Sequence, residues 1–236
     1  MQFTQYNDAI FDGFCLHSKK NEIINRKHEI INRICQYYNL AANSVLFIGF
    51  NPAALTIKAN EVYLAEVSQK AFDYLKAQRP SIQLYDQPRK FDLIVAFDEY
   101  LTFARTEVQQ KQMIDNLCSL SAKLAITTVK DYKNQDFKDR EYSQPAIIKH
   151  DEDITAFTEI HNWHTTEKNS WETNLYQLRG NQATCCGQYQ RRSLFFKQLA
   201  KFSIDNGAKN FLVHKNMMYK SIIKKNYEHI ISISFC

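Results

Sequence analysis

One stretch of the chain, residues 44–69 (SVLFIGFNPAALTIKANEVYLAEVSQ), constrains the fold more than any other. It holds two extended runs rich in apolar residues, 45–48 and 62–65, which are closed by Gly49 and by Glu66. A run that is apolar on both faces is typical of a strand buried in a parallel sheet and covered by helices. The stretch therefore predicts two neighbouring parallel strands joined through a turn and about two turns of helix.

The residues that follow each strand suit a ligand site. Gly49 permits a tight turn and the close approach of a ligand to the backbone. Asn51 and Pro52 suit the N-cap and the first position of a helix, and a helix N-terminus favours a polar or anionic ligand. Glu66, 17 residues after Gly49, stands where a carboxylate at a strand end accepts hydrogen bonds from ribose hydroxyls.

The first half of the chain continues in alternating helices and strands. Residues 1–20 form a lead-in segment that we expect to pack on the core through Phe3, Ile10, Phe11 and Phe14. Apolar periodicity then predicts a helix at 21–40, a helix at 68–78, strands at 82–85 and 91–97, a helix at 107–120 with Val108, Met113, Ile114 and Leu117 on its buried face, and a strand at 123–129. This rhythm predicts a parallel sheet with right-handed crossovers.

The second half breaks the rhythm and then resumes it. Residues 131–189 contain three alternating runs that predict antiparallel strands, which we interpret as a β-rich insert or cap over the site. His161 and His164 within it would point to opposite faces of a strand, so we expect no metal site. Beyond the insert, the pattern predicts a helix at 191–206 capped by Gly207, a strand at 210–214, a short basic helix or loop at 217–225 and a last strand at 229–235.

The pattern resembles the class I S-adenosylmethionine-dependent methyltransferases. The closest match is EVYLAEVSQKAFDYL, a strand that ends in an acid and leads directly into a helix. The resemblance implies an α/β fold of the Rossmann-like type, with a mostly parallel seven-stranded sheet and helices on both faces. The resemblance covers residues 21–129 and 191–235. We therefore expect a methyltransferase-like domain at 1–130 and 190–236, with 131–189 as the insert on the substrate side. The glycine loop departs from the family, which usually has an acid where Phe47 stands and a second glycine where Asn51 stands.

The resemblance also implies a cofactor site. S-adenosylmethionine would lie against the glycine loop and the acids that follow successive strands, leaving S-adenosylhomocysteine as the product. The residues so implied are Gly49, Phe50, Asn51, Pro52, Glu66, Val67, Asp86 and Asp98. Three acids that each follow a strand would line one edge of the sheet, where open parallel sheets bind ligands. Asp98 or Glu99 would be the nearest base by analogy, and no residue is assigned as catalytic.

The charge is uneven along the chain. The formal net charge is +5, and residues 190–236 hold nine Lys or Arg against two Asp or Glu. Such asymmetry is typical either of a polyanion-binding surface or of an ordinary solvated surface. The six cysteines lack paired metal spacing, and we see no signal peptide or membrane-length apolar run. We therefore expect a cytoplasmic protein with free thiols, without a metal and without a membrane partner.

Two hypotheses of different classes follow. The first is a methyltransferase with an unknown acceptor, for which nucleic acid is one candidate. The second is a non-catalytic scaffold that binds nucleic acid or a protein through a basic C-terminal face, with Arg191, Arg192, Lys197, Lys201, Lys220, Lys224 and Lys225 as phosphate contacts. A nicotinamide enzyme ranks last, because the fingerprint needs glycine at Asn51. An open pocket beside Gly49 favours the first hypothesis, whereas a filled one favours the second.

Overall fold

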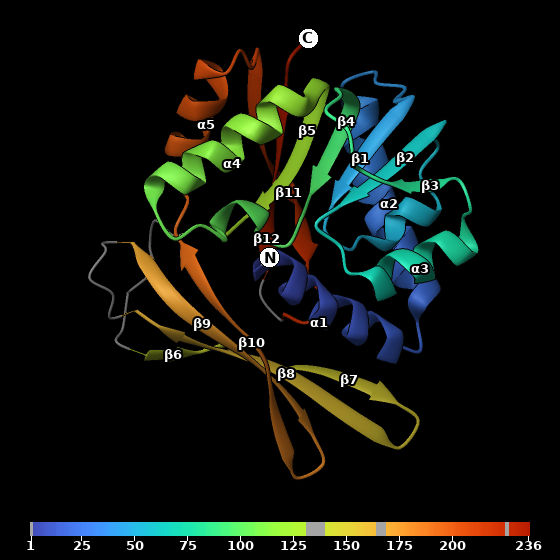
Figure 1. Cartoon of the computed structure of the whole chain (residues 1–236), viewed down its shortest axis with the longest axis vertical. Helices are drawn as coiled ribbons and strands as arrows, with labels where there is room; N and C mark the ends of the chain where they lie inside the picture. Colours follow the sequence, from blue (N-terminus) through green and yellow to red (C-terminus); the bar gives the residue numbers. More distant parts are fainter. Residues whose placement is uncertain (1, 131–139, 164–168, 225–226) are drawn as a thin grey trace.

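A computed structural model describes residues 2–130, 140–163, 169–224 and 227–236. Its strands form two sheets, one of seven strands and one of five (Figure 1). The elements of the first part are α1 (Gln2–Leu16), α2 (Lys20–Tyr37), β1 (Ser44–Ile48), the 3₁₀ turn η1 (Pro52–Leu55), β2 (Glu61–Ala65), α3 (Gln69–Gln78), β3 (Ile82–Leu84), β4 (Phe91–Ala96), η2 (Tyr100–Thr102), α4 (Glu107–Leu120) and β5 (Ser121–Val129). The remaining elements are β6 (Arg140–Tyr142), β7 (Ala146–His150), β8 (Asp153–Asn162), β9 (Ser170–Arg179), β10 (Gln182–Arg192), α5 (Phe196–Asp205), β11 (Asn210–Lys220) and β12 (Tyr227–Ser234).

The seven-stranded sheet has the order β11-β12-β5-β4-β1-β2-β3. Neighbours from β3 to β5 pair in parallel, and β12 runs antiparallel between β5 and β11. All five side chains of β1 are buried, as expected for a strand covered on both faces. The predicted fold class, an α/β fold with a mostly parallel seven-stranded sheet, is therefore confirmed. The carboxyl ends of β1 to β5 all lie at one edge of this sheet, which we call the rim.

Helices cover both faces of the large sheet. On one face α4 packs against β4, β5 and α5, and the side-chain amide of Asn206 donates to Asp115 on α4 over 2.7 Å. On the other face α2 and α3 both contact η1, and the hydroxyls of Tyr38 and Ser232 lie 2.8 Å apart, joining the end of α2 to β12. This two-sided cover explains why β1 and β4 consist mainly of apolar residues.

The five-stranded sheet lies beyond the rim, with α1 between it and the large sheet (Figure 1). It is antiparallel, in the order β10-β9-β8-β6 with β7 also paired to β8. α1 contacts both β10 and β7, and its residues Phe3, Ile10, Phe11 and Phe14 are buried as predicted. The sequence pattern indicated only a lead-in segment, whereas the structure shows a helix of 15 residues placed on the rim.

Four local expectations were wrong. The helix between β1 and β2 is a single 3₁₀ turn, and the guanidinium of Arg79 donates to the carbonyl of Ala54 within it and to those of Ile57 and Ala59 after it. Val108 is 67% exposed, and the buried face of α4 includes Gln110 instead. β10 extends through Arg192, so the helix expected from residue 191 begins at Phe196. Residues expected as a basic helix or loop continue β11 as far as Lys220.

No helix among the described residues combines the length and the apolar character needed to cross a membrane.

Candidate functional site

The glycine loop and the acid after β2 lie side by side at the rim. The backbone N–H of Gly49 donates to the carbonyl of Ala65 over 2.8 Å, which brings the turn after β1 next to Glu66. Gly49 has a φ of +86°, a conformation that favours glycine. Asn51 caps η1, since its side chain accepts from the N–H of Ala53 over 3.0 Å, and Pro52 takes the first helical position. The local geometry predicted for these residues is therefore present.

The first turns of α1 sit directly on this loop. The hydroxyl of Thr4 donates to Oε2 of Glu66 over 3.0 Å. The side-chain oxygen of Asn7 accepts from the N–H of Phe50 over 2.9 Å. A Cβ added at Gly49 would come within 2.8 Å of side-chain atoms of both Asn7 and Phe3. The surface of Gly49 that the sequence suggested for a ligand is thus covered by a helix of the same chain.

An aromatic cluster fixes α1 in this place. The ring of Phe3 packs edge-on against Tyr100, at 4.9 Å between centroids, and against Phe103, at 5.0 Å. Phe50 is buried and contacts the rings of Phe11 and Phe14. The predicted site residue Phe50 is therefore part of the core between α1 and the sheet. Pro52, another predicted site residue, is also buried.

The remaining predicted site residues differ in their exposure. Glu66 and Asp86 are exposed, and Val67 is half-buried. Asp98 is buried, and one of its carboxylate oxygens accepts from the hydroxyl of Tyr219 over 2.7 Å. All four follow β2, β3 or β4, so the sheet order places them along one rim. The structure brings Gly49 and Glu66 together, and it turns Asp98 inward.

The backbone at the rim is strained. Glu66, Asp98 and Glu99 have φ values of +55°, +58° and +56°. The left-handed region is uncommon for residues other than glycine, and such conformations gather at functional sites because the surrounding structure must hold them. Here the N–H of Glu99 donates to the hydroxyl of Thr128 at the end of β5 over 3.1 Å. In this conformation the side chain of Glu99 reaches Arg191 of the second sheet, whereas that of Asp98 meets Tyr219 on β11.

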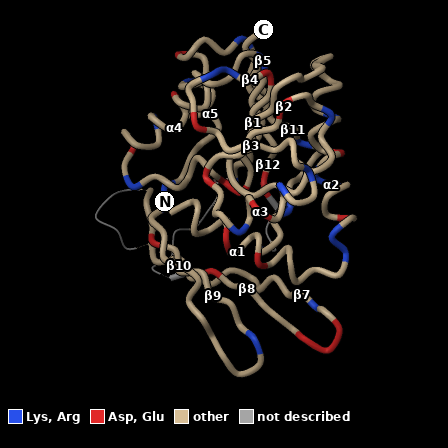
Figure 2. Tube along the Cα trace, turned by 45° about the vertical axis from the view of Figure 1, so that its right-hand side comes forward, with Lys and Arg blue, Asp and Glu red and all other residues tan. Residues whose placement is uncertain are grey.

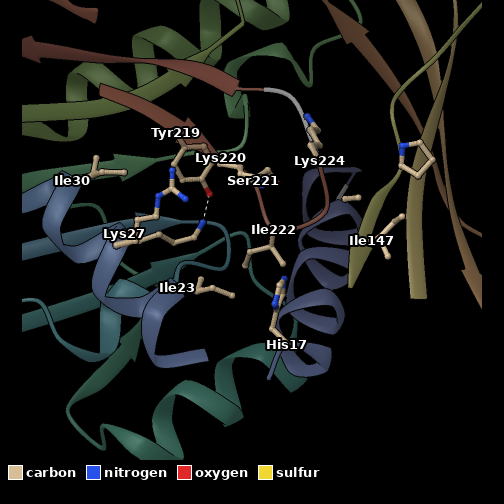
Figure 3. A pocket seen from close by; sticks show the side chains of 13 residues that line it. His17, Ile23, Lys27, Ile30, Ile147, Tyr219, Lys220, Ser221, Ile222 and Lys224 are labelled. Atoms are coloured by element: carbon tan, nitrogen blue, oxygen red, sulfur yellow. Dashed lines mark hydrogen bonds between the residues drawn. The ribbon is translucent and has the colours of Figure 1, made fainter. Parts of the chain in front are cut away.

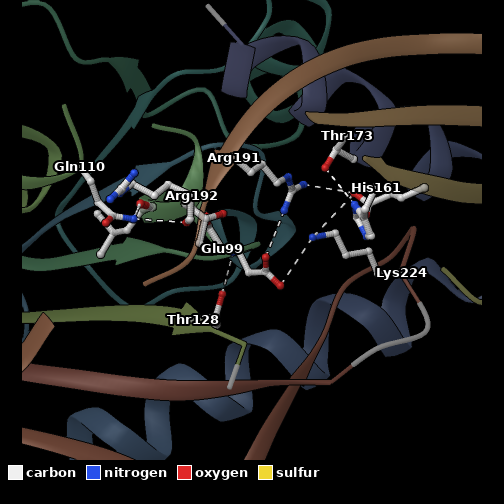
Figure 4. A network of polar contacts seen from close by, with 11 residues as sticks. Glu99, Gln110, Thr128, His161, Thr173, Arg191, Arg192 and Lys224 are labelled. Carbon is white, nitrogen blue, oxygen red and sulfur yellow. Dashed lines mark hydrogen bonds and ion pairs between the residues drawn. The ribbon is translucent and has the colours of Figure 1, made fainter. Parts of the chain in front are cut away.

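A buried network of charges joins the rim to the second sheet (Figure 4). The guanidinium of Arg191 on β10 pairs with Glu99 over 3.1 Å and with Glu159 on β8 over 3.2 Å. Lys224 lies 3.8 Å from Glu99 and 3.9 Å from Glu159. Each of these side chains is at most 5% exposed. The carboxylates are held between two cations, so the four charges balance in a low-dielectric interior.

The pKa values of the network follow from this arrangement. Burial raises the pKa of Glu159, but the charges of Lys224 and Arg191 outweigh it and lower the pKa to about 2. Burial lowers the pKa of His161 to about 4, against the opposing charge of Glu159. Its ring Nδ1 lies 2.9 Å from the hydroxyl of Thr173. Near neutral pH, the network therefore holds ionised carboxylates beside a neutral histidine.

A second buried group behaves differently. Glu228 at the start of β12 is 1% exposed. Burial raises its pKa to about 8, and the negative charges of Glu99 and Asp98 act in the same direction, against that of Lys224. The side chain is therefore mostly protonated at neutral pH. Burial also lowers the pKa of Lys27, whose ammonium group donates to the hydroxyl of Tyr219.

Sequence reasoning missed α1 and the charge network. The buried residues of α1 include Phe3, Tyr6, Ile10 and Phe14, which recur at helical spacings of three and four. That periodicity could have identified the helix, although nothing in it indicates contact with Gly49. Of the residues assigned to a basic surface, Arg191 and Lys224 are buried in ion pairs, and Lys225 lies outside the described residues. The expectation that His161 and His164 form no metal site concerns a residue, His164, that also lies outside the described residues.

Comparison with known proteins identifies the fold. No family model matches the sequence, and no curated protein matches it either. Among solved structures, the chain is similar to DesVI from Streptomyces venezuelae, with 11% identity over 96% of this chain and 97% of that one, at a TM-score of 0.68. This chain has the class I methyltransferase fold.

Two further structures share this methyltransferase fold. An amino pentose methyltransferase from Micromonospora echinaspora, CalS10, solved with S-adenosylmethionine bound, has 9% identity over 90% of this chain and 91% of that one, at a TM-score of 0.65. An S-adenosylmethionine-dependent methyltransferase from Clostridium acetobutylicum has 13% identity over 89% and 90% of the two chains, at a TM-score of 0.63. No group of three or more potential metal ligands occurs among the described residues of the methyltransferase fold or its insert.

Proposed function

We propose that this chain is an S-adenosylmethionine-dependent methyltransferase whose cofactor binds at the rim between Gly49 and Glu66. The observation that carries the proposal is the contact between the loop after β1 and the end of β2, made by the hydrogen bond from Gly49 to Ala65. It sets the glycine turn, which α1 now covers, beside an exposed carboxylate, at the edge where parallel sheets bind nucleotides. The bound cofactor would supply an electrophilic methyl group.

The residues at the rim fit this cofactor once the first turns of α1 move aside. Glu66 has the acceptor oxygens that ribose hydroxyls need, and one of them now accepts from Thr4. The N–H of Phe50 offers a backbone donor, which Asn7 now occupies. A ligand must therefore replace contacts that α1 makes with its own chain.

The size of the required movement follows from burial. Phe3, Tyr6, Ile10 and Phe14 are each at most 4% exposed. Exposing four such side chains would cost roughly 6–12 kcal/mol, at about 1.5–3 kcal/mol each. That approaches the whole stability of a typical domain. We therefore infer a local shift of residues 3–7, with the rest of α1 remaining on the core.

The chain itself would position the acceptor and exclude water. The second sheet and α1 cover the rim from the side opposite the large sheet (Figure 1). Methyl transfer to a nucleophilic acceptor needs alignment and exclusion of water more than acid–base chemistry. Two carboxylates, those of Asp98 and Glu99, follow β4 at the rim. That of Glu99 already forms an ion pair with Arg191.

A non-catalytic scaffold is the second candidate. The observation that favours it is the occupation of the Gly49 loop by Phe3 and Asn7, which fills the space that a cofactor needs. Its basic surface is smaller than the sequence suggested, because Arg191 and Lys224 are buried. Lys197 and Lys201 on α5 remain exposed, and Figure 2 shows Lys and Arg on several parts of the chain, α2 included.

Calorimetric titration with S-adenosylhomocysteine separates the two candidates. We expect the wild-type chain to bind it and Glu66→Ala to bind at least ten-fold more weakly. Glu61→Ala is the matched control, because Glu61 lies at the opposite end of the same strand and pairs with Arg89. Absence of binding at high micromolar ligand, in the wild type and in a variant with weakened α1 contacts, would favour the scaffold.

A further inference from the structure

A separate cavity of about 350 Å³ lies between α2, the end of β11 and β7 (Figure 3). Ile23 and Ile30 of α2 form one wall, and Ile147 of β7 faces them from the second sheet. The link after β11 contributes Ser221 and Ile222. Cavities of this volume hold small organic molecules in proteins.

The charged side chains that line this cavity are all basic. The lining contains His17, Arg26, Lys27, Lys220 and Lys224, and no aspartate or glutamate. Lys224 is already paired with Glu99 and Glu159, and Lys27 contacts Tyr219. Arg26 and Lys220 are exposed and form no ion pair with any residue that the structure describes. Two cations at the mouth are therefore available to a ligand.

Two further observations support an anionic ligand. The hydroxyl of Ser221 is buried and has no hydrogen-bond partner among the described residues, although buried hydroxyls are usually satisfied. His17 at the same cavity has a lowered pKa, first because of burial and then because of the charge of Lys220. A carboxylate or phosphate group would accept from such donors and offset the excess positive charge.

The apolar part of the lining defines the rest of the ligand. Ile147 is 62% exposed although it faces other isoleucines across the cavity, so it leaves apolar surface open to water. Covering such surface contributes roughly 25 cal/mol per Å². A small apolar body attached to the anionic group would cover it.

We propose that this cavity binds a small organic anion, with Arg26 and Lys220 holding the charged group and the isoleucines of α2 and β7 holding the apolar body. The inner wall is Tyr219, whose hydroxyl donates to Asp98 at the rim. The bound anion would thus lie one side chain away from the carboxylates after β4. The proposal concerns binding alone, and it stands whether or not the chain transfers methyl groups.

Nuclear magnetic resonance titration of the full chain with phenyl phosphate tests it. We expect saturable shifts at residues of this cavity, and at least ten-fold weaker binding of the neutral analogue benzyl alcohol. Inorganic phosphate, which lacks the apolar body, should bind more weakly than phenyl phosphate. Shifts that map elsewhere, or equal binding of the neutral analogue, would overturn the proposal.

Two matched double variants distinguish binding by the cations of the cavity from a non-specific effect of the protein's net positive charge. Arg26→Gln with Lys220→Gln should weaken phenyl phosphate binding at least ten-fold. Arg33→Gln with Lys215→Gln removes the same charge from the same two elements outside the cavity, and it should change binding less than two-fold. Equal weakening by both pairs would contradict the proposal. Amide spectra of each variant establish that it is folded.

Discussion

The hydroxyl of Thr4 donates a hydrogen bond of 3.0 Å to the carboxylate of Glu66, so the N-terminal helix occupies the acceptor that we propose for the ribose of the cofactor. α1 and the proposed cofactor therefore compete for one oxygen. A hydrogen bond to a partly exposed carboxylate contributes about 1 kcal/mol. Its removal would raise the fraction of molecules whose rim is open to a ligand.

Thr4→Val should therefore strengthen the binding of S-adenosylhomocysteine about five-fold, the factor that corresponds to about 1 kcal/mol. Thr4→Ser keeps the hydroxyl and should bind like the wild type. Calorimetry on the three proteins measures the effect. Unchanged or weaker binding by Thr4→Val would show that α1 does not compete with the cofactor.

Gly49→Ala should destabilise the protein by more than the cost of placing an alanine at a positive φ. Gly207 is the matched control, because its φ of +87° equals that of Gly49 within a degree and nothing lies within 4 Å of a Cβ built there. We expect Gly207→Ala to cost about 1–2 kcal/mol from the backbone. Gly49→Ala should cost about 1–3 kcal/mol more, because its methyl group displaces Asn7 and Phe3. Denaturant midpoints give both values, and equal losses would place α1 away from Gly49.

Arg191→Met should destabilise the fold by about 3–5 kcal/mol, because it leaves Glu99 and Glu159 buried with less compensation. Arg179 on the neighbouring strand is the control. Its pair with Asp153 is more than half exposed, so Arg179→Met should cost less than about 1 kcal/mol. Chemical unfolding of both variants at pH 7 measures the difference. Similar losses for the two would contradict the buried network.

Glu228→Gln should change how stability depends on pH. The folded pKa of Glu228, about 8, lies above the usual value for a glutamate, so the folded state binds a proton that the unfolded state has released. Between about pH 5 and pH 8 this group lowers the free energy of unfolding by about 1.4 kcal/mol per pH unit as pH rises. Glu228→Gln removes that slope.

The measurement is the free energy of unfolding of the wild type and the variant from pH 5.5 to 7.5. The gap between the two curves should widen with pH in favour of the variant. The exposed Glu107→Gln serves as the control and should follow the wild type in parallel. Parallel curves for Glu228→Gln would contradict the raised pKa.

The sequence predicted the large sheet well because its signal is local. β1 and β4 are mainly apolar runs, as is typical of strands covered on both faces, and the turn chemistry of Asn51 and Pro52 appeared as expected. The contact of Asn7 with Phe50 joins residues 43 apart, and that of Arg191 with Glu99 joins residues 92 apart. Such long-range contacts depend on how helices and strands pack against one another. The periodicity within one segment carries no information about them.

The same distinction explains the candidate site. Gly49 and Glu66 could be placed together because neighbouring parallel strands end at the same edge of a sheet. Arg191 was expected to face outward from a helix, whereas it is the buried partner of two carboxylates from distant strands. The sequence around an arginine in a basic stretch does not distinguish an exposed side chain from one that is buried in ion pairs.

The most direct test of the central claim is an amide shift titration of the full chain with S-adenosylhomocysteine. We predict saturable shifts at Gly49, Phe50 and Glu66, together with the side-chain amide of Asn7 as it leaves the N–H of Phe50. The cavity residues His17 and Lys220 should change little. A titration that leaves Gly49 and Glu66 unshifted at saturating ligand would contradict the account.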